Sequence, residues 1–264
     1  MTDQPGAHPY TYWTYQQGQI TPTNGGVVAE ARLSIFINAQ EIATIMCSPT
    51  EQKALALGFL HNEGMIHSLA EVKLMQSNVP GTTVDIFLDR SDFTPPRRLV
   101  LTSGCSGGVS FQDWQAHYPA LTSAFTTTPE TIFALMRAMQ GTADLYRRVR
   151  GVHAAALGNP GGLLLSAEDI GRHNTIDKVA GKALLGGVAT RDQILTTSGR
   201  ISSEMLIKAR MMDIPIVASH TSPTSVTVQL AELWDICVAG YVRQDKMRIY
   251  THPERLGFAA SPSQ

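Results

Sequence analysis

The second half of the chain repeats one order of segments three times: a short apolar segment, a polar turn and a segment with helical spacing. The apolar segments span 163–166, 194–197 and 214–219, and the helical segments span 170–185, 202–212 and 225–233. Strands that alternate with helices are typical of an α/β fold whose sheet is partly parallel and covered by helices on both faces. Turns that follow parallel strands meet at one sheet edge, where ligands bind in such folds.

The first half predicts a smaller N-terminal α+β portion. Leu33, Ile35 and Ile37 alternate with polar residues, as in a half-buried strand. The run Ser48-Pro49-Thr50-Glu51 has the spelling of a helix start, with Ser as N-cap and Glu at the third position, and predicts a helix that ends near Gly64. Further strands are expected at 84–88, 97–102 and 152–157, a helix at 128–150, and a hairpin at 236–242 and 247–251.

These elements predict the domain organisation. We expect a loose arm over residues 1–26, because this segment is rich in Thr, Gln, Pro and Gly and ends in Asn24-Gly25-Gly26. A single domain is expected over 27–257, with a soft subdivision near 125–150, followed by a tail at 258–264.

Charge and hydropathy exclude several classes of protein. Lys and Arg number 21 and Asp and Glu 22, so the net charge of −1 argues against duplex nucleic acid as a partner. No apolar run reaches the roughly 18 residues of a membrane helix, so we expect no membrane association. An odd count of three widely spaced cysteines, with no export signal, predicts reduced thiols in the cytoplasm.

Cys105 is the first candidate for chemistry. It lies in the glycine-rich run Ser103-Gly104-Cys105-Ser106-Gly107-Gly108, and glycines let a backbone approach a ligand closely. Such a loop would expose the thiol, whose reactivity requires a lowered pKa. An ordinary buried cysteine in a glycine turn is the open alternative. Cys47 and Cys237 lie in apolar stretches and are interpreted as core residues.

The polar run 168–178 is the second candidate, because it joins an apolar strand to an apolar helix. Three of its pairs have the i,i+4 spacing that brings helix side chains together, which are Glu168 with Arg172, Asp169 with His173, and His173 with Asp177. A His between two carboxylates could be oriented by them or have a raised pKa. A solvated first helix turn, stabilised by charge pairs, is the alternative.

Three further polar segments could bind phosphate. Ser198-Gly199-Arg200 opens a helix, where hydroxyl, glycine and guanidinium groups suit an anion. Ser219 to Thr224 follows the next strand, and the terminal hairpin carries Arg243, Lys246 and Arg248. Helix capping and a solvated surface are the alternatives. The His-x-Glu and Pro-Cys-x-x-Cys strings of zinc deaminases do not occur, so no metal site is predicted, and His153 is interpreted as a packed residue.

Several long motifs in one order resemble the formate dehydrogenase accessory sulfurtransferase family, FdhD/NarQ. They are residues 151–157 (GVHAAAL), 168–174 (EDIGRHN) with Asp177-Lys178, 198–200 (SGR), 203–205 (SEM) with Lys208-Ala209, 222–224 (SPT), 230–232 (LAE) and 250–255 (YTHPER). The resemblance covers roughly residues 25–257. It departs from the family pattern at Gly108, where the family loop has a second Cys, and at Asp213, where the family has Gly.

The resemblance implies a cytidine-deaminase-like fold without the zinc site. It also implies a cytoplasmic homodimer that takes persulfide sulfur from a cysteine desulfurase. The sulfur would pass through Cys105 to the molybdenum or tungsten bis(pterin guanine dinucleotide) cofactor that formate dehydrogenase needs. The residues expected to bind this cofactor are Tyr241, Val242, Arg243, Gln244, Asp245, Lys246, Arg172, His173, Ser198, Arg200, Ser222 and Thr224.

Two other functions stay open on the residues alone. One is a chaperone that binds and delivers the cofactor without moving sulfur, which the loss of the second Cys favours. The other is a deaminase-like hydrolase, against which the missing metal ligands argue.

Overall fold

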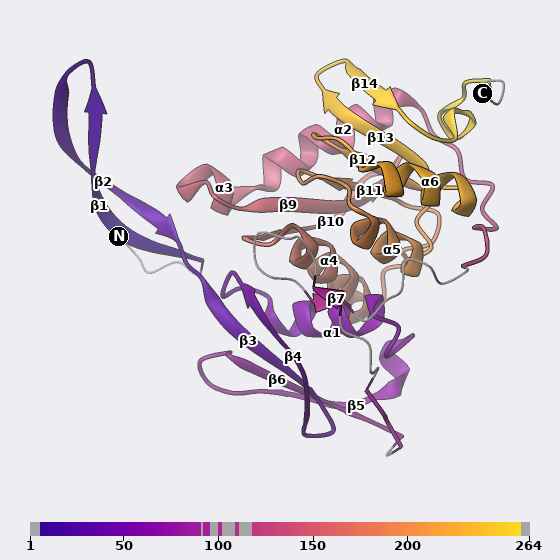
Figure 1. The fold of residues 1–264 in the computed structure, drawn as a ribbon, viewed down its shortest axis with the longest axis horizontal. Coiled ribbons are helices and arrows are strands. Elements are labelled where there is room, and N and C mark those ends of the chain that lie inside the picture. The colour runs from indigo at the N-terminus through magenta and orange to yellow at the C-terminus, as the bar shows by residue number, and fades with distance from the viewer. Residues whose placement is uncertain (1–5, 91, 96–99, 102–108, 111–117, 260–264) are drawn as a thin grey trace.

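The computed structural model describes residues 6–90, 92–95, 100–101, 109–110 and 118–259. Two sheets, one of six strands and one of four, lie on either side of a helical layer (Figure 1). The six-stranded sheet contains β9 (His153–Asn159), β10 (Gly162–Asp169), β11 (Ile194–Thr197), β12 (Ile216–Ser219), β13 (Cys237–Arg243) and β14 (Lys246–Ile249). Its order is β10-β9-β11-β12-β13-β14, and only the pairs β11–β12 and β12–β13 are parallel.

Helices cover both faces of this sheet, which confirms the predicted mixed α/β class. One face carries α4 (Arg172–Gly186), α5 (Ser203–Met211) and α6 (Ser225–Trp234), and the other carries α2 (Pro129–Thr142) (Figure 1). Successive strand residues point to opposite faces, so Leu195 packs under α4 to α6 while Ile194 packs under α2. A likeness to cytidine deaminases in particular stays a prediction.

The smaller sheet follows the predicted α+β portion. It contains β3 (Ala31–Ile37), β4 (Gln40–Cys47), β5 (Val72–Ser77) and β6 (Thr83–Leu88) in the order β4-β3-β6-β5. Leu33, Ile35 and Ile37 are fully buried, as their alternation predicts. The other elements are α1 (Gln52–Asn62), α3 (Asp144–Val149), η1 (Leu69–Glu71), η2 (Pro253–Leu256), β7 (Val100–Leu101) and β8 (Val109–Ser110).

Two glycines allow the helices α1 and α4 to pack closely where they cross, between the two halves of the molecule. A Cβ added at Gly58 would lie 1.8 Å from the carbonyl oxygen of Asp177, and one at Gly181 would lie 1.9 Å from that of Ala54. Only glycine lets two helix backbones come this close. The contact places the α4 N-terminus, and the polar run before it, between the two sheets.

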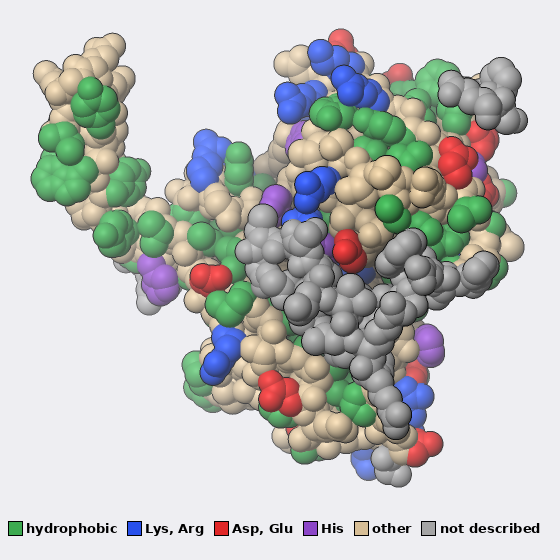
Figure 2. Space-filling view, viewed as in Figure 1, with side chains coloured by type: hydrophobic (Ala, Val, Ile, Leu, Met, Phe, Trp, Pro, Cys, Tyr) green, Lys and Arg blue, Asp and Glu red, His purple; other side chains and the backbone are tan. Residues whose placement is uncertain are grey.

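The N-terminal residues are not the irregular arm that their composition predicts. β1 (Ala7–Gln16) pairs with β2 (Gln19–Val28) in an antiparallel hairpin that extends away from the body (Figures 1 and 2). A two-residue turn joins them, with positive φ at Gln17 and Gly18. Tyr, Trp and Thr favour strands, and this preference outweighs the turn-forming Asn and Gly residues that suggested a loose segment.

Local boundaries differ from the prediction at two helices. The first helix starts at Gln52, and its N-cap, Glu51, makes no side-chain cap bond. The Ser48 hydroxyl instead accepts a hydrogen bond from the Ile170 N–H at 3.2 Å, so a long-range contact replaces the predicted capping box. The helix expected over 128–150 breaks at Ala143 into α2 and α3.

The chain changes from one sheet to the other before α2, because α2 already packs on the six-stranded sheet. The predicted single domain over 27–257 with its soft subdivision stays a prediction. Among the described residues, no helix combines the length and the apolar character that crossing a bilayer requires.

Candidate functional site

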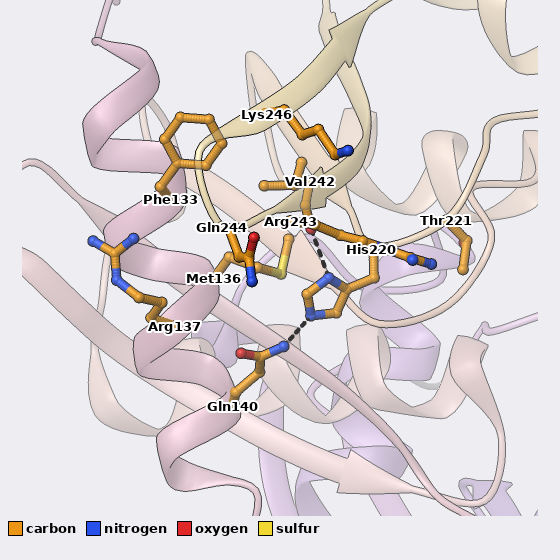
Figure 3. A pocket seen from close by; sticks show the side chains of 10 residues that line it. All are labelled: Phe133, Met136, Arg137, Gln140, His220, Thr221, Val242, Arg243, Gln244 and Lys246. Carbon is orange, nitrogen blue, oxygen red and sulfur yellow. Dashed lines mark hydrogen bonds between the residues drawn. The ribbon is translucent and has the colours of Figure 1, made fainter.

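Two adjoining pockets form a trough along one edge of the six-stranded sheet. The first has a volume of about 560 Å³ and lies between α2 and the β13–β14 hairpin (Figure 3). The second, of about 450 Å³, lies between the α2–α3 segment and the start of β9. Gln140 and His220 line both pockets, so the two pockets meet at these residues.

The strand directions explain why polar groups gather at this edge. The turns after β11 and β12 leave the sheet side by side, because these strands are parallel. β9 is antiparallel to β11, so it begins where β11 ends. Ser198, His220 and His153 therefore meet in the trough, although they are far apart in sequence. This confirms the predicted convergence of two of the polar turns.

The trough is cationic. Its described lining residues include Arg137, Arg243 and Lys246 in the first pocket and Arg147 and Arg150 in the second, and none of them is Asp or Glu. The cations come from α2 on one side and from the hairpin on the other (Figure 3). Cations around a concave surface attract anionic ligands and pair with phosphate oxygens.

His220 divides the trough through two hydrogen bonds. Its Nδ1 donates to the Val242 carbonyl at 2.7 Å, and its Nε2 lies 2.5 Å from the Gln140 amide nitrogen (Figure 3). With Nδ1 as the donor, Nε2 accepts from the Gln140 amide N–H. His220 thus ties α2 to the hairpin.

His153 and Ser198 form the wall of the second pocket. The Ser198 hydroxyl accepts from the Ala154 N–H at 2.9 Å and lies 3.4 Å from Nδ1 of His153. Burial, together with the nearby charge of Arg172, lowers the pKa of His153 below its ordinary value of 6.5. His153 is thus a packed neutral residue, as predicted, and it also faces the pocket.

His173 does not lie between two carboxylates, so the predicted rise in its pKa is wrong. Its Nε2 lies 3.3 Å from the Ser202 hydroxyl and 4.0 Å from Glu204. Burial and the neighbouring charges of Lys208 and Arg172 lower the pKa of His173 to about 3. The predicted i,i+4 pairs do not form, because the carboxylates bind partners from other parts of the fold instead.

Those partners form two buried ion-pair clusters. Asp169 lies 2.6 Å from Lys178, and Asp177 lies 2.8 Å from Lys208, which Glu63 also approaches at 3.4 Å. Asp169 further accepts from the Ser48 N–H and Asp177 from the Asn62 amide. The alternative of a solvated first turn is also wrong, since these side chains are almost fully buried.

The other predicted binding residues divide into two groups. Val242, Arg243, Gln244 and Lys246 line the trough, whereas Tyr241 and Asp245 belong to the same hairpin without lining it. Arg172, His173, Arg200, Ser222 and Thr224 line neither pocket. Thr224 is the N-cap of α6, whose side chain accepts from the Thr227 N–H at 3.3 Å. A ligand contact for any of these residues stays a prediction.

Sequence reasoning missed the wall that α2 and α3 contribute. Arg137 and Gln140 lie on the exposed side of α2, and Arg147 and Arg150 follow in α3 and at its end. The signal was present, because these cations immediately precede the 151–157 motif. Such a pattern does not by itself indicate a pocket wall, because a polar helix face is usually just solvated.

The three cysteines also divide. Cys105 lies outside the described residues, so its environment stays a prediction. Cys47 and Cys237 are fully buried, as predicted, and burial raises the pKa of each thiol to about 12. Both are therefore protonated at neutral pH, and neither has the thiolate that sulfur chemistry requires.

Comparisons with known proteins agree on one family. The model of the FdhD/NarQ family matches residues 28–257. "Sulfur carrier protein FdhD" of Bacillus subtilis (strain 168) is 38% identical over 252 residues, which cover 92% of this chain and 95% of that protein. The protein of the same name from Staphylococcus haemolyticus is 33% identical over 247 residues, which cover 92% and 94%.

A solved structure has the same fold. It is described as a putative formate dehydrogenase accessory protein from Desulfotalea psychrophila, and it superposes with a TM-score of 0.81 at 25% identity. The match covers 96% of this chain and all of that one. The two sheets and the trough edge described above thus belong to an architecture that this structure shares.

Proposed function

We propose, from the premise that this chain belongs to the FdhD/NarQ family, that it is a sulfur carrier for the maturation of formate dehydrogenase. Its relatives bear the name sulfur carrier protein, and the chain aligns with them over nearly their whole length. The finer proposal is a sulfurtransferase of the cytoplasm. It would accept sulfur from a cysteine desulfurase, act as a homodimer, and hand the sulfur to a cofactor destined for formate dehydrogenase.

The cationic trough is the observation that carries the proposal beyond the family. A molybdenum or tungsten bis(pterin guanine dinucleotide), as the substrate that receives sulfur, brings several phosphate groups. Arg137, from α2, and Arg243, from the β13–β14 hairpin, line the first pocket, and Arg150 lines the second. Guanidinium groups bind phosphates by paired charge-assisted hydrogen bonds. The two pockets, of similar size, offer space for both ends of such a molecule.

Cys105 is the residue to which we assign the sulfur. Its thiolate would attack the outer sulfur of the donor's persulfide; the donor S–S bond breaks, and the donor cysteine leaves as a thiolate. Cys105 then holds the persulfide. Cys47 and Cys237 cannot replace it, because both thiols are buried and protonated. One cysteine suffices for this step, so the Gly108 that replaces the family's second Cys does not block it.

The test is to load the purified protein with a cysteine desulfurase and cysteine, and to map the product by mass spectrometry without reductant. A persulfide adds about 32 Da to the peptide that holds Cys105. The C105A variant should stay unmodified, while the matched C47A variant should load like the wild type. Sulfur on another peptide, or none with an active cognate desulfurase, contradicts the assignment and favours a chaperone that only binds the cofactor.

A further inference from the structure

Arg172 is a buried cation for which the part of the chain that the structure describes provides no ion pair. It is 5% exposed, and its Nε and Nη2 are buried and have no hydrogen-bond partner. None of the ion pairs among the described residues includes it. Its side chain lies across Gly199, where an added Cβ would be 2.9 Å from Cβ and 3.2 Å from Cδ of Arg172. The glycine thus makes room for the arginine stem.

An uncompensated buried charge is unfavourable, and buried guanidinium groups are normally paired. Lys178 and Lys208 show this rule nearby, since each contacts a carboxylate within 3 Å. Arg172 departs from this rule, since two of its buried nitrogens have no hydrogen-bond partner. Neutral oxygens can satisfy a guanidinium, as the carbonyls of Phe125 and Ser123 do for Arg255, but a buried full charge is compensated best by an anion from outside the described residues.

The titratable groups near Arg172 are neutral rings or an acid that already has a cation. Arg172 is the first residue of α4, and the N-cap Gly171 donates its backbone N–H to Asp169 at 2.9 Å. His153 lies 3.5 Å from a Cβ added at the same Gly199. The charge of Arg172 also acts on His173, whose Nε2 lies 4.0 Å from Glu204. Asp169 is bound to Lys178.

We propose that Arg172 is the centre of an anion subsite behind the trough wall and that it takes a small sulfur anion, such as the terminal sulfur of a persulfide. The inference rests on the proposed sulfur-carrier function for the kind of anion, but not for the existence of the site. A site this buried strips the ligand of its water. A large, polarisable sulfur anion loses less hydration energy on burial than a phosphate does. The phosphate therefore suits the open trough better than this buried site.

The experiment compares thiosulfate with sulfate, two dianions that differ by one sulfur in place of one oxygen. Thermal unfolding midpoints of the full chain are measured with each sodium salt at equal concentration. The variants are R172M, which removes the charge, and R172K, which keeps it. R32Q is the control, because Arg32 is an exposed arginine on the other sheet. Each variant is compared with itself without added anion, which removes its own baseline difference, and the response of R32Q reports the general effect of each salt.

We expect thiosulfate to raise the wild-type midpoint by about 3 °C more than sulfate does. R32Q should respond like the wild type, R172K should keep part of the response, and R172M should lose it. Without anion, R172M should unfold at the wild-type temperature or higher, because it removes an unpaired buried charge.

Three results would overturn the inference in different ways. Equal responses to both anions that vanish in R172M would leave an oxyanion site and refute the sulfur assignment. Responses that do not depend on Arg172 would be those of an adventitious ion only. A midpoint well below the wild type for R172M without anion would make Arg172 a structural residue. Persulfide loading of Cys105 is measured separately, so a failed sulfur-carrier function is distinguishable from a failed subsite.

Discussion

Lys208 and Arg243 show two uses of positive charge in one protein. Lys208, on α5, is buried, and its ammonium group contacts both oxygens of Asp177 within 3 Å. Arg243, at the trough, is exposed and has no ion pair among the described residues. The first cation is satisfied inside the fold, and the second is left for a ligand.

The difference teaches how to interpret polar motifs of this chain. The run 168–178 is dense in charge, yet most of its members hold the two halves of the molecule together through Lys178 and Asp177. Only Arg172 in that run lacks a partner. Whether a charged side chain has a partner inside the fold, rather than how many polar residues surround it, distinguishes structural residues from candidate binding residues.

Replacing Lys208 by Met should have the largest effect on stability. It leaves Asp177 and Glu63 buried without their cation, and such a loss costs about 3–5 kcal/mol of the free energy of unfolding. Urea unfolding measures this. The double variant K208M/D177L should recover part of the loss, because it removes the orphaned charge. A K208M protein as stable as the wild type would show that the ion-pair cluster of Lys208, Asp177 and Glu63 does not stabilise the fold.

His173 should make stability depend on pH. Burial lowers its folded pKa to about 3, below the ordinary value of 6.5, so between these values the unfolded chain binds a proton that the folded chain does not. The free energy of unfolding should therefore fall as the pH falls, by up to about 1.4 kcal/mol per unit for this group.

The measurement is urea unfolding of the wild type and H173Q from pH 7 to pH 4. His153 and His61, whose pKa values are also lowered, are present in both proteins and contribute equally. We expect a shallower slope for H173Q. Identical slopes would mean that His173 is not the buried neutral group described above.

Thr224 should behave as a helix cap, with a smaller effect. Its side chain accepts from the Thr227 N–H, so T224A should cost about 1 kcal/mol of the free energy of unfolding. It should leave affinity for guanosine diphosphate unchanged, because Thr224 does not line the trough. The opposite pattern, with affinity lost and stability kept, would restore Thr224 to the binding residues. T224S, which keeps the hydroxyl, is the control.

The sequence predicted most of the six-stranded sheet, because its strands β9, β11, β12 and β13 are largely buried runs rich in apolar residues. The strand at Ile194–Thr197 and the helix start at Ser225 are found as expected. Prediction from the sequence failed where a residue far away in the chain determines the local structure. Ser48 bonds Ile170 instead of capping a helix, and no local pattern reveals that.

The site was predicted in the same uneven way. The hairpin cations and Ser198 follow strands, so their place at the sheet edge could be inferred from topology. The contribution of α2 could not, because a helix is connected to that edge only by packing. The pairing of Asp177 with Lys208 links residues 31 positions apart and decides which charges remain for a ligand.

The division between holding and binding charges is tested most directly on one protein, the double variant R243Q/K246Q. Its affinity for guanosine diphosphate and its urea unfolding are measured side by side with those of the wild type. The account predicts an affinity at least about tenfold lower, through loss of two phosphate-binding cations, with the free energy of unfolding within about 0.5 kcal/mol of the wild type. Unchanged affinity with a clear loss of stability would contradict it.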